Sequence, residues 1–191
     1  MTTVKTIKLI YCISILAVLS ACGYQNIKDE ESIFYAVPVG SLLVLNQEVT
    51  ISGDQVAIYV QNGEIMRYKD VNNYKPNCKF EIYTISEHQR TVQADTFEII
   101  KVEDEIESSS LQANVQLAAL DNLAANNIAL GLLDHSQMFN YATMMYLSSD
   151  QQKDVYRMTC QHWEDIVDDR HLTISQMRTA MGDVFTLKIK E

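Results

Sequence analysis

Cysteine and histidine side chains are the groups in this sequence whose spacing is most suggestive of chemistry. Cys160-Gln161-His162 places a thiol and an imidazole two residues apart, His171 follows nine residues later, and Cys78 stands elsewhere in the chain. On a strand, residues two apart point to the same face, so a Cys₂His₂ zinc site fits this geometry. The sequence lacks the Cys-x₂-Cys and His-x₃-His spacings that make zinc motifs specific, which favours a structural role for both histidines.

The first 22 residues have the pattern of an export signal. Lys5 and Lys8 form a basic region, and residues 9–19 form an apolar stretch too short to span a bilayer. Leu19-Ser20-Ala21-Cys22 follows directly. This tetrapeptide resembles the lipobox of bacterial lipoproteins, and the resemblance implies cleavage before Cys22 and lipidation of that cysteine.

The resemblance also implies where the protein lies. It predicts a signal peptide at 1–21, acyl chains including palmitate on Cys22, and a membrane as the first partner. Gly23 stands where an Asp commonly retains such proteins at the inner membrane, which favours the outer membrane facing the periplasm. Removal of two lysines takes the net charge from −10 to −12, so the lipid must provide the anchor, and nucleic acid is excluded as an electrostatic partner.

An exported chain changes the interpretation of its cysteines. Cys12 leaves with the signal and Cys22 carries lipid, so Cys78 and Cys160 remain as an even pair. We expect them to form a disulfide in an oxidising compartment, closing a loop of about 80 residues. A zinc site or a reactive thiol remain the alternatives.

Strand signals dominate the body of the chain. Asn62-Gly63 supplies the two positive φ values of a type I′ turn, and Ser52–Gln55 is a turn signal before it. These turns predict an antiparallel meander of three segments. The expected strands are 42–51, 56–61, 65–69, 80–85, 97–102, 139–147, 155–163 and 184–189.

One helix is predicted near the C-terminus. Thr173 and Gln176 can form a capping box at the start of a helix that ends near Gly182. The whole pattern predicts a mainly β fold: a small antiparallel sandwich or partly closed barrel with one or two helices in the C-terminal half. Residues 22–36 would be a lipidated N-terminus and tether, and 37–191 a single domain in which 108–135 is a helical or mobile insertion.

No complete catalytic motif is present. There is no Gly-x-Ser-x-Gly elbow, and the carboxylates near His162 are typical of a solvated loop. We therefore expect no cofactor and a non-enzymatic structural or interaction module with an envelope protein as partner. The alternative is a periplasmic metal-binding or enzymatic protein that uses His162, His171 and nearby carboxylates. Residues 156–163, 170–174 and 182–185 also resemble uncharacterised envelope lipoproteins of proteobacteria, which implies no known activity.

Overall fold

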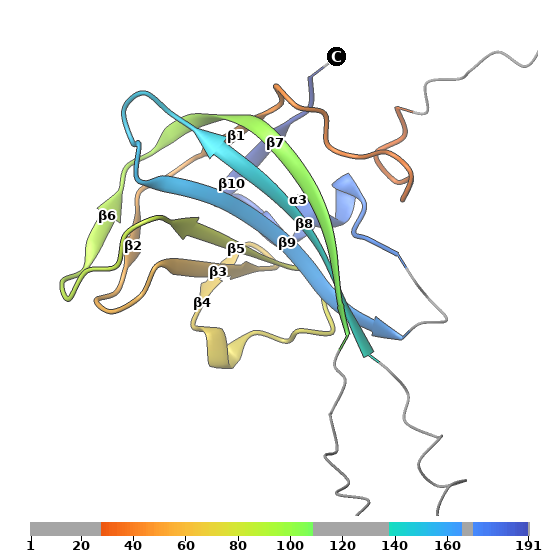
Figure 1. The fold of residues 1–191 in the computed structure, drawn as a ribbon, viewed down its shortest axis with the longest axis horizontal. Coiled ribbons are helices and arrows are strands. Elements are labelled where there is room, and N and C mark those ends of the chain that lie inside the picture. The colour runs from red at the N-terminus through yellow and green to blue at the C-terminus, as the bar shows by residue number, and fades with distance from the viewer. Residues whose placement is uncertain (1–27, 109–137, 166–169, 191) are drawn as a thin grey trace, which may run out of the picture.

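The computed structural model describes residues 28–108, 138–165 and 170–190, which form a mainly β domain. Eight antiparallel strands make one sheet that curls into a half-barrel, with a C-terminal helix against it (Figure 1). The predicted fold class is confirmed. The predicted signal peptide, Cys22 and nearly all of the 108–135 insertion lie outside the described residues. Ser108 is the last residue of a strand.

The large sheet has the strand order β10-β1-β7-β8-β9-β5-β3-β4, and a small sheet pairs β2 with β6. The strands of the large sheet are β1 Leu42–Leu45, β3 Ala57–Gln61, β4 Glu64–Met66, β5 Asn77–Ile82, β7 Asp95–Ser108, β8 Met138–Ser148, β9 Val155–Asp165 and β10 Phe185–Lys188. The small sheet contains β2 Val49–Ile51 and β6 Arg90–Val92, and the helices are the 3₁₀ turn η1 Tyr68–Asp70 and α3 Ile174–Met181.

The prediction of one strand over residues 42–51 was wrong, because the chain turns at Asn46 and divides it between the two sheets. The Asn46 amide donates to the Asp183 carbonyl and the Thr186 hydroxyl at 3.0 and 2.9 Å, which holds this corner against the C-terminal strand. The expected three-stranded meander was therefore also wrong. β1 pairs with β10 and β7, whereas β3 pairs with β4 and β5.

Two predicted hairpins are confirmed. Asn62 and Gly63 have φ values of 52° and 79° and join β3 to β4, as a type I′ turn requires. β8 and β9 pair along most of their length, from Met138 opposite Asp165 to Tyr146 opposite Arg157. Both hairpins join neighbouring segments of the chain, so the local turn signal was sufficient to predict them.

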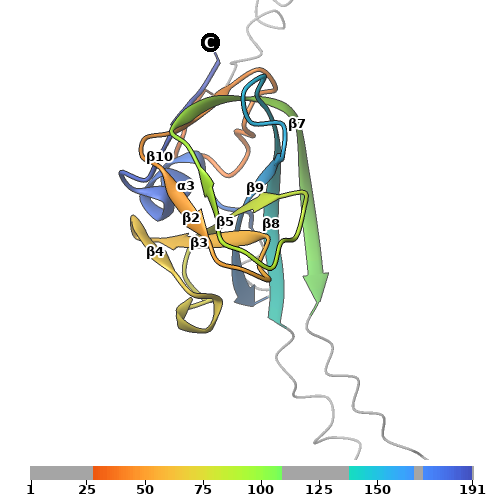
Figure 2. The ribbon, with the colours of Figure 1, turned by 90° about the vertical axis from the view of Figure 1, so that its left-hand side faces the viewer.

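The hydrophobic core lies inside the curl of the sheet, which bends back on itself (Figure 2). Phe80 is fully buried at its centre, with ring centroids 5.9 Å from Phe97 and 5.1 Å from Phe185. Helix α3 covers the open side of the half-barrel and begins at the predicted capping box, in which Thr173 and Gln176 bond each other's main chain. Its buried residues are Ile174, Met177, Ala180 and Met181.

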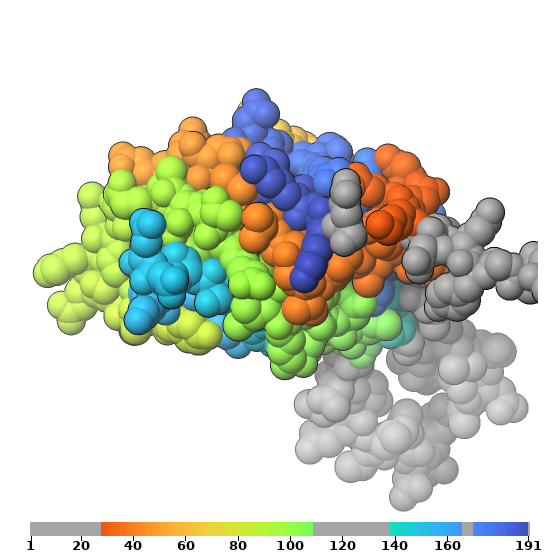
Figure 3. Space-filling model, turned by 90° about the horizontal axis from the view of Figure 1, so that it is seen from above, coloured from red at the N-terminus to blue at the C-terminus, as the bar shows by residue number. Residues whose placement is uncertain are grey.

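The described N-terminal segment lies against the C-terminal part of the domain (Figure 3). Glu30 forms an ion pair with Arg178, and its carbonyl accepts a hydrogen bond from the Ser175 main chain at 3.2 Å. Farther along, the Ser41 hydroxyl accepts from the Lys190 main chain at 3.0 Å. Residues 28–36, which the sequence assigns to a tether, thus contact helix α3.

Candidate functional site

Cys78 and Cys160 meet in the middle of the sheet. Cys78 on β5 lies directly opposite Cys160 on β9, with a Cα–Cα distance of 4.0 Å and an S–S distance of 2.07 Å. The short Cα–Cα distance is typical of a non-hydrogen-bonded antiparallel pair, in which side chains approach most closely. Both cysteines are fully buried. The predicted pairing is therefore present, as a bridge between neighbouring strands of one sheet.

His162 and His171 both lie beside the ring of Tyr141. The ring centroid of Tyr141 lies 6.1 Å from His162 and 5.6 Å from His171. His162 is buried, and its Nε2 lies 2.9 Å from the Arg170 carbonyl, which accepts its hydrogen bond. His171 Nδ1 lies 3.7 Å from a carboxylate oxygen of Asp104. The structure thus gathers both predicted histidines at one end of the half-barrel.

The disulfide takes the two thiols that a Cys₂His₂ zinc site would need. Within residues 28–108, 138–165 and 170–190, no group of three or more His, Cys, Asp or Glu side chains is arranged to hold a metal ion. Of the four carboxylates near His162 in the sequence, Glu164 and Asp165 end strand β9, whereas Asp168 and Asp169 lie outside the described residues. Asp104, which the sequence did not connect with the histidines, has a carboxylate oxygen 3.7 Å from His171 Nδ1.

A second concentration of polar side chains lies on the outer face of the sheet. Arg157 on β9 binds the Glu81 carboxylate on β5 at 2.6 Å and stacks over Tyr156, with its guanidinium carbon 5.0 Å from the ring centroid. Lys79 also binds Glu81, at 2.9 Å. The ring of Tyr83 lies 4.4 Å from that of Tyr156. We call this the outer-face cluster, comprising Lys79, Glu81, Tyr83, Lys101, Glu103, Met144, Tyr146, Tyr156, Arg157 and Thr159.

The charged side chains of the outer-face cluster pair with one another, and its three cations and two carboxylates leave a net charge of +1. Burial raises the pKa of Glu81, but hydrogen bonds and charge from Arg157 and Lys79 outweigh it and lower the pKa below the usual range. Tyr146 donates its hydroxyl to Glu103 at 2.7 Å, and this bond raises the tyrosine pKa. Because the charged groups of the cluster are engaged in ion pairs with one another, they are poorly placed to act as general acids or bases. Its stacked aromatic rings fix the shape of the surface.

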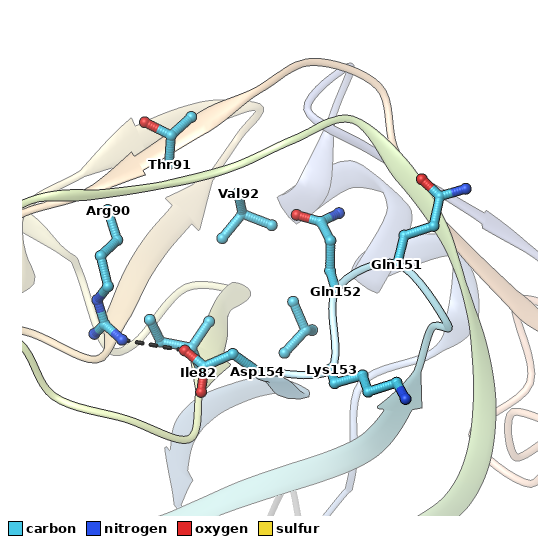
Figure 4. Close-up of a pocket in the computed structure, with 9 residues that line it drawn as sticks. Ile82, Arg90, Thr91, Val92, Gln151, Gln152, Lys153 and Asp154 are labelled. Carbon is cyan, nitrogen blue, oxygen red and sulfur yellow. Dashed lines mark hydrogen bonds and ion pairs between the residues drawn. The ribbon is translucent and has the colours of Figure 1, made fainter.

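A pocket of about 390 Å³ lies between β6 and the turn that joins β8 to β9 (Figure 4). Its floor is apolar, because Ile82, Val92 and Val155 are all buried. At one end Arg90 binds Asp154 at 3.1 Å. Gln151 and Lys153 point away from the pocket (Figure 4).

Asp95 fixes the turn beside this pocket. Its carboxylate accepts from the Ser149 hydroxyl at 2.6 Å and from the Gln152 amide at 3.2 Å. Burial raises the pKa of Asp95, yet these bonds and one from the Thr96 main chain lower it overall. The polar side chains of the turn are therefore held in place against strand β7.

Comparison of the chain with protein-family models, with curated proteins and with solved structures finds no match. Its function must therefore be argued from its own residues. No helix in the described residues is long and apolar enough to cross a membrane.

Sequence reasoning missed the outer-face cluster and the pocket beside β6. Two-residue alternation within 155–163 puts Arg157 on the face opposite Cys160. It gave no sign that Glu81, 76 positions before Arg157, would be its partner. The pocket had no local signal, since its walls come from β5, β6 and the β8–β9 turn.

Proposed function

We propose that this protein is exported, anchored by a lipid on Cys22 to the outer membrane on its periplasmic side, and binds a protein partner there without catalysing a reaction. The anchor follows from the resemblance of Leu19-Ser20-Ala21-Cys22 to a lipobox. Durable attachment takes more than one acyl chain, because each buried CH₂ contributes only about 0.8 kcal/mol.

The observation that carries the proposal is the buried cystine. Cys78 and Cys160 face each other across two central strands, so their thiols are positioned to oxidise as the sheet forms. Stable disulfides belong to oxidising compartments such as the periplasm. The export signal would bring the chain to such a compartment, and the two features therefore support one another.

A binding role is favoured by the way the polar groups are used. The charged side chains of the outer-face cluster are paired within it, and the carboxylate of Asp95 is occupied by the turn. Groups engaged in this way give a surface fixed shape and are poorly placed to exchange protons with a substrate.

Metabolic labelling of cells with a palmitate analogue tests the anchor. The wild-type chain and a Cys12→Ala variant should both take up label and sediment with membranes, because Cys12 is removed with the signal. Cys22→Ala should lose both properties. A wild-type chain that takes up no label and stays in the soluble fraction would disprove the lipid anchor.

The position of His171 favours a second candidate, a metal-binding or enzymatic role. Its Nδ1 is buried, has no hydrogen-bond partner among the described residues, and faces Asp104 at 3.7 Å. Metal analysis of the purified protein before and after chelation distinguishes the two candidates. Stoichiometric metal lost on chelation and absent from His171→Ala would support this second role and count against the first.

A further inference from the structure

The two sheets have four edges, those of β10, β4, β2 and β6, and β2 contacts β3. Arg178 covers the β10 edge, because its Nε and Nη2 donate to the Leu187 carbonyl at 3.1 and 2.9 Å. β4 begins with the exposed Glu64, and a charged residue on an edge strand discourages pairing with another chain. The outer edge of β6 instead faces the pocket floored by Ile82, Val92 and Val155.

The side-chain amide of Gln152 already fills one strand position beside β6. Its Oε1 accepts from the Gln93 main-chain N–H at 2.9 Å, and its Nε2 donates to the Gln93 carbonyl at 2.9 Å. A residue in a neighbouring antiparallel strand would exchange this same pair of bonds with Gln93. The main-chain groups of Gln93 therefore point outward, away from β2.

In an extended chain, the direction of the main-chain groups of Gln93 also fixes the direction of those of Thr91, two residues earlier. Residues two apart direct their N–H and carbonyl groups to the same side, so those of Thr91 point toward the pocket, as Gln93's do toward Gln152. Thr50 lies opposite Thr91 on β2, and its main-chain groups point the other way. In the described part of the chain, no residue outside β2 forms a main-chain hydrogen bond with Thr91.

We propose that the edge of β6 binds an extended segment of a partner protein as an added strand, with Thr91 exchanging main-chain hydrogen bonds and one aliphatic side chain of the segment entering the pocket. The apolar floor suits a Val or Ile side chain, and the Arg90–Asp154 pair closes one end. This inference rests on the proposed function, which postulates a protein partner, and it assigns that partner a binding site.

The segment is assigned to another protein because of where this chain's own ends lie. Lys28, Ser108 and Met138 flank the long parts of the chain outside the described residues. In Figure 1, β2 and β6 lie on the left, whereas β7 ends, β8 begins and the described N-terminal segment starts on the right. A second copy of this chain is the other possible source of a strand, and the test below distinguishes it.

The test uses the purified full-length protein and a panel of seven-residue, threonine-containing peptides. The peptides differ only at the central position, which is valine, isoleucine, alanine or lysine. A matched set carries N-methyl groups on alternate main-chain nitrogens, which removes donors from one edge of the peptide. Binding is measured by titration and by hydrogen exchange at the Thr91 amide.

Valine or isoleucine peptides should bind and protect the Thr91 amide, whereas lysine and N-methylated peptides should not. Thr91→Pro removes the outward donor and should weaken binding at least tenfold, while Thr50→Pro, on the opposite rung, should leave it within about twofold. Thermal unfolding checks that both variants fold. Should Thr91→Pro fail to fold, amide protection in the wild-type protein decides.

The site assignment is wrong if no peptide protects the Thr91 amide at millimolar concentration, or if both proline variants bind equally well. A dimer of the free protein that Thr91→Pro dissociates would assign the edge to a second copy and overturn the partner. Peptide binding needs no membrane, so its failure leaves the lipid-labelling result intact, and loss of the anchor leaves the peptide result intact.

Discussion

Breaking the bond between Cys78 and Cys160 should lower the free energy of unfolding by about 4.5 kcal/mol at 25 °C. This value follows from the sequence separation of 82 residues, because a cross-link that closes so long a loop removes much of the conformational entropy of the unfolded chain. Native disulfides removed from small domains cost about 2–5 kcal/mol, so the expected loss lies near the upper end of that range.

Reduction isolates this effect better than substitution does. Both cysteines are fully buried, so the reduced protein keeps both sulfur atoms in the core, and the loss of the cross-link acts mainly on the unfolded chain. Cys78→Ala/Cys160→Ala removes those sulfur atoms as well, and a small cavity term adds to its loss of stability.

Urea unfolding of the wild-type protein with and without a reductant measures the difference. The slope of the free energy against urea should also rise on reduction, because the unfolded chain exposes more surface once the link is gone. The double alanine variant is the control for the reductant, and its unfolding curve should not respond. A wild-type loss below about 1 kcal/mol, or an equal response of the control, would refute the reasoning.

Two further predictions concern the outer-face cluster and the end of helix α3. Glu81→Gln should cost about 1–3 kcal/mol at pH 7, because it weakens a bond to Arg157 within a largely buried pair. Because folding lowers the pKa of Glu81, the ionised carboxylate stabilises the fold at any pH above its unfolded-state pKa. This stabilisation is lost as the pH falls through the folded-state pKa. Below about pH 5 the wild type should therefore lose more stability than Glu81→Gln. Urea curves at several pH values check this, with the exposed Glu98→Gln as control; equal acid sensitivity of wild type and Glu81→Gln would contradict it. Gly182→Ala should cost about 1–3 kcal/mol, because Gly182 has φ +52° and an added Cβ would lie 2.4 Å from the Gly63 Cα. Thermal unfolding measures this loss of stability, with the exposed Thr179→Ala as the control variant. Equal melting temperatures of the two variants would show that Gly182 and Gly63 do not restrict each other.

Several elements of the fold could be predicted because their causes are local in the chain. Asn62 and Gly63 tolerate positive φ and so specify a hairpin wherever the flanking residues alternate. Thr173 and Gln176 satisfy the first main-chain groups of helix α3 within four residues. The Cys78–Cys160 pair was predicted by counting, because the export hypothesis assigns the other two cysteines to the signal peptide and to the lipid.

The sequence by itself therefore determined the mainly β class, the hairpins, the C-terminal helix and the cysteine pairing. Only the tertiary structure decided that β1 lies between β10 and β7, and that Gln152 lies beside Gln93. The physical reason is that neighbouring strands in the sheet come from distant parts of the chain, and many registers satisfy the same two-residue alternation of apolar side chains. The packing of the common core selects one of them, and that selection brings Arg157 to Glu81 and opens the pocket beside β6.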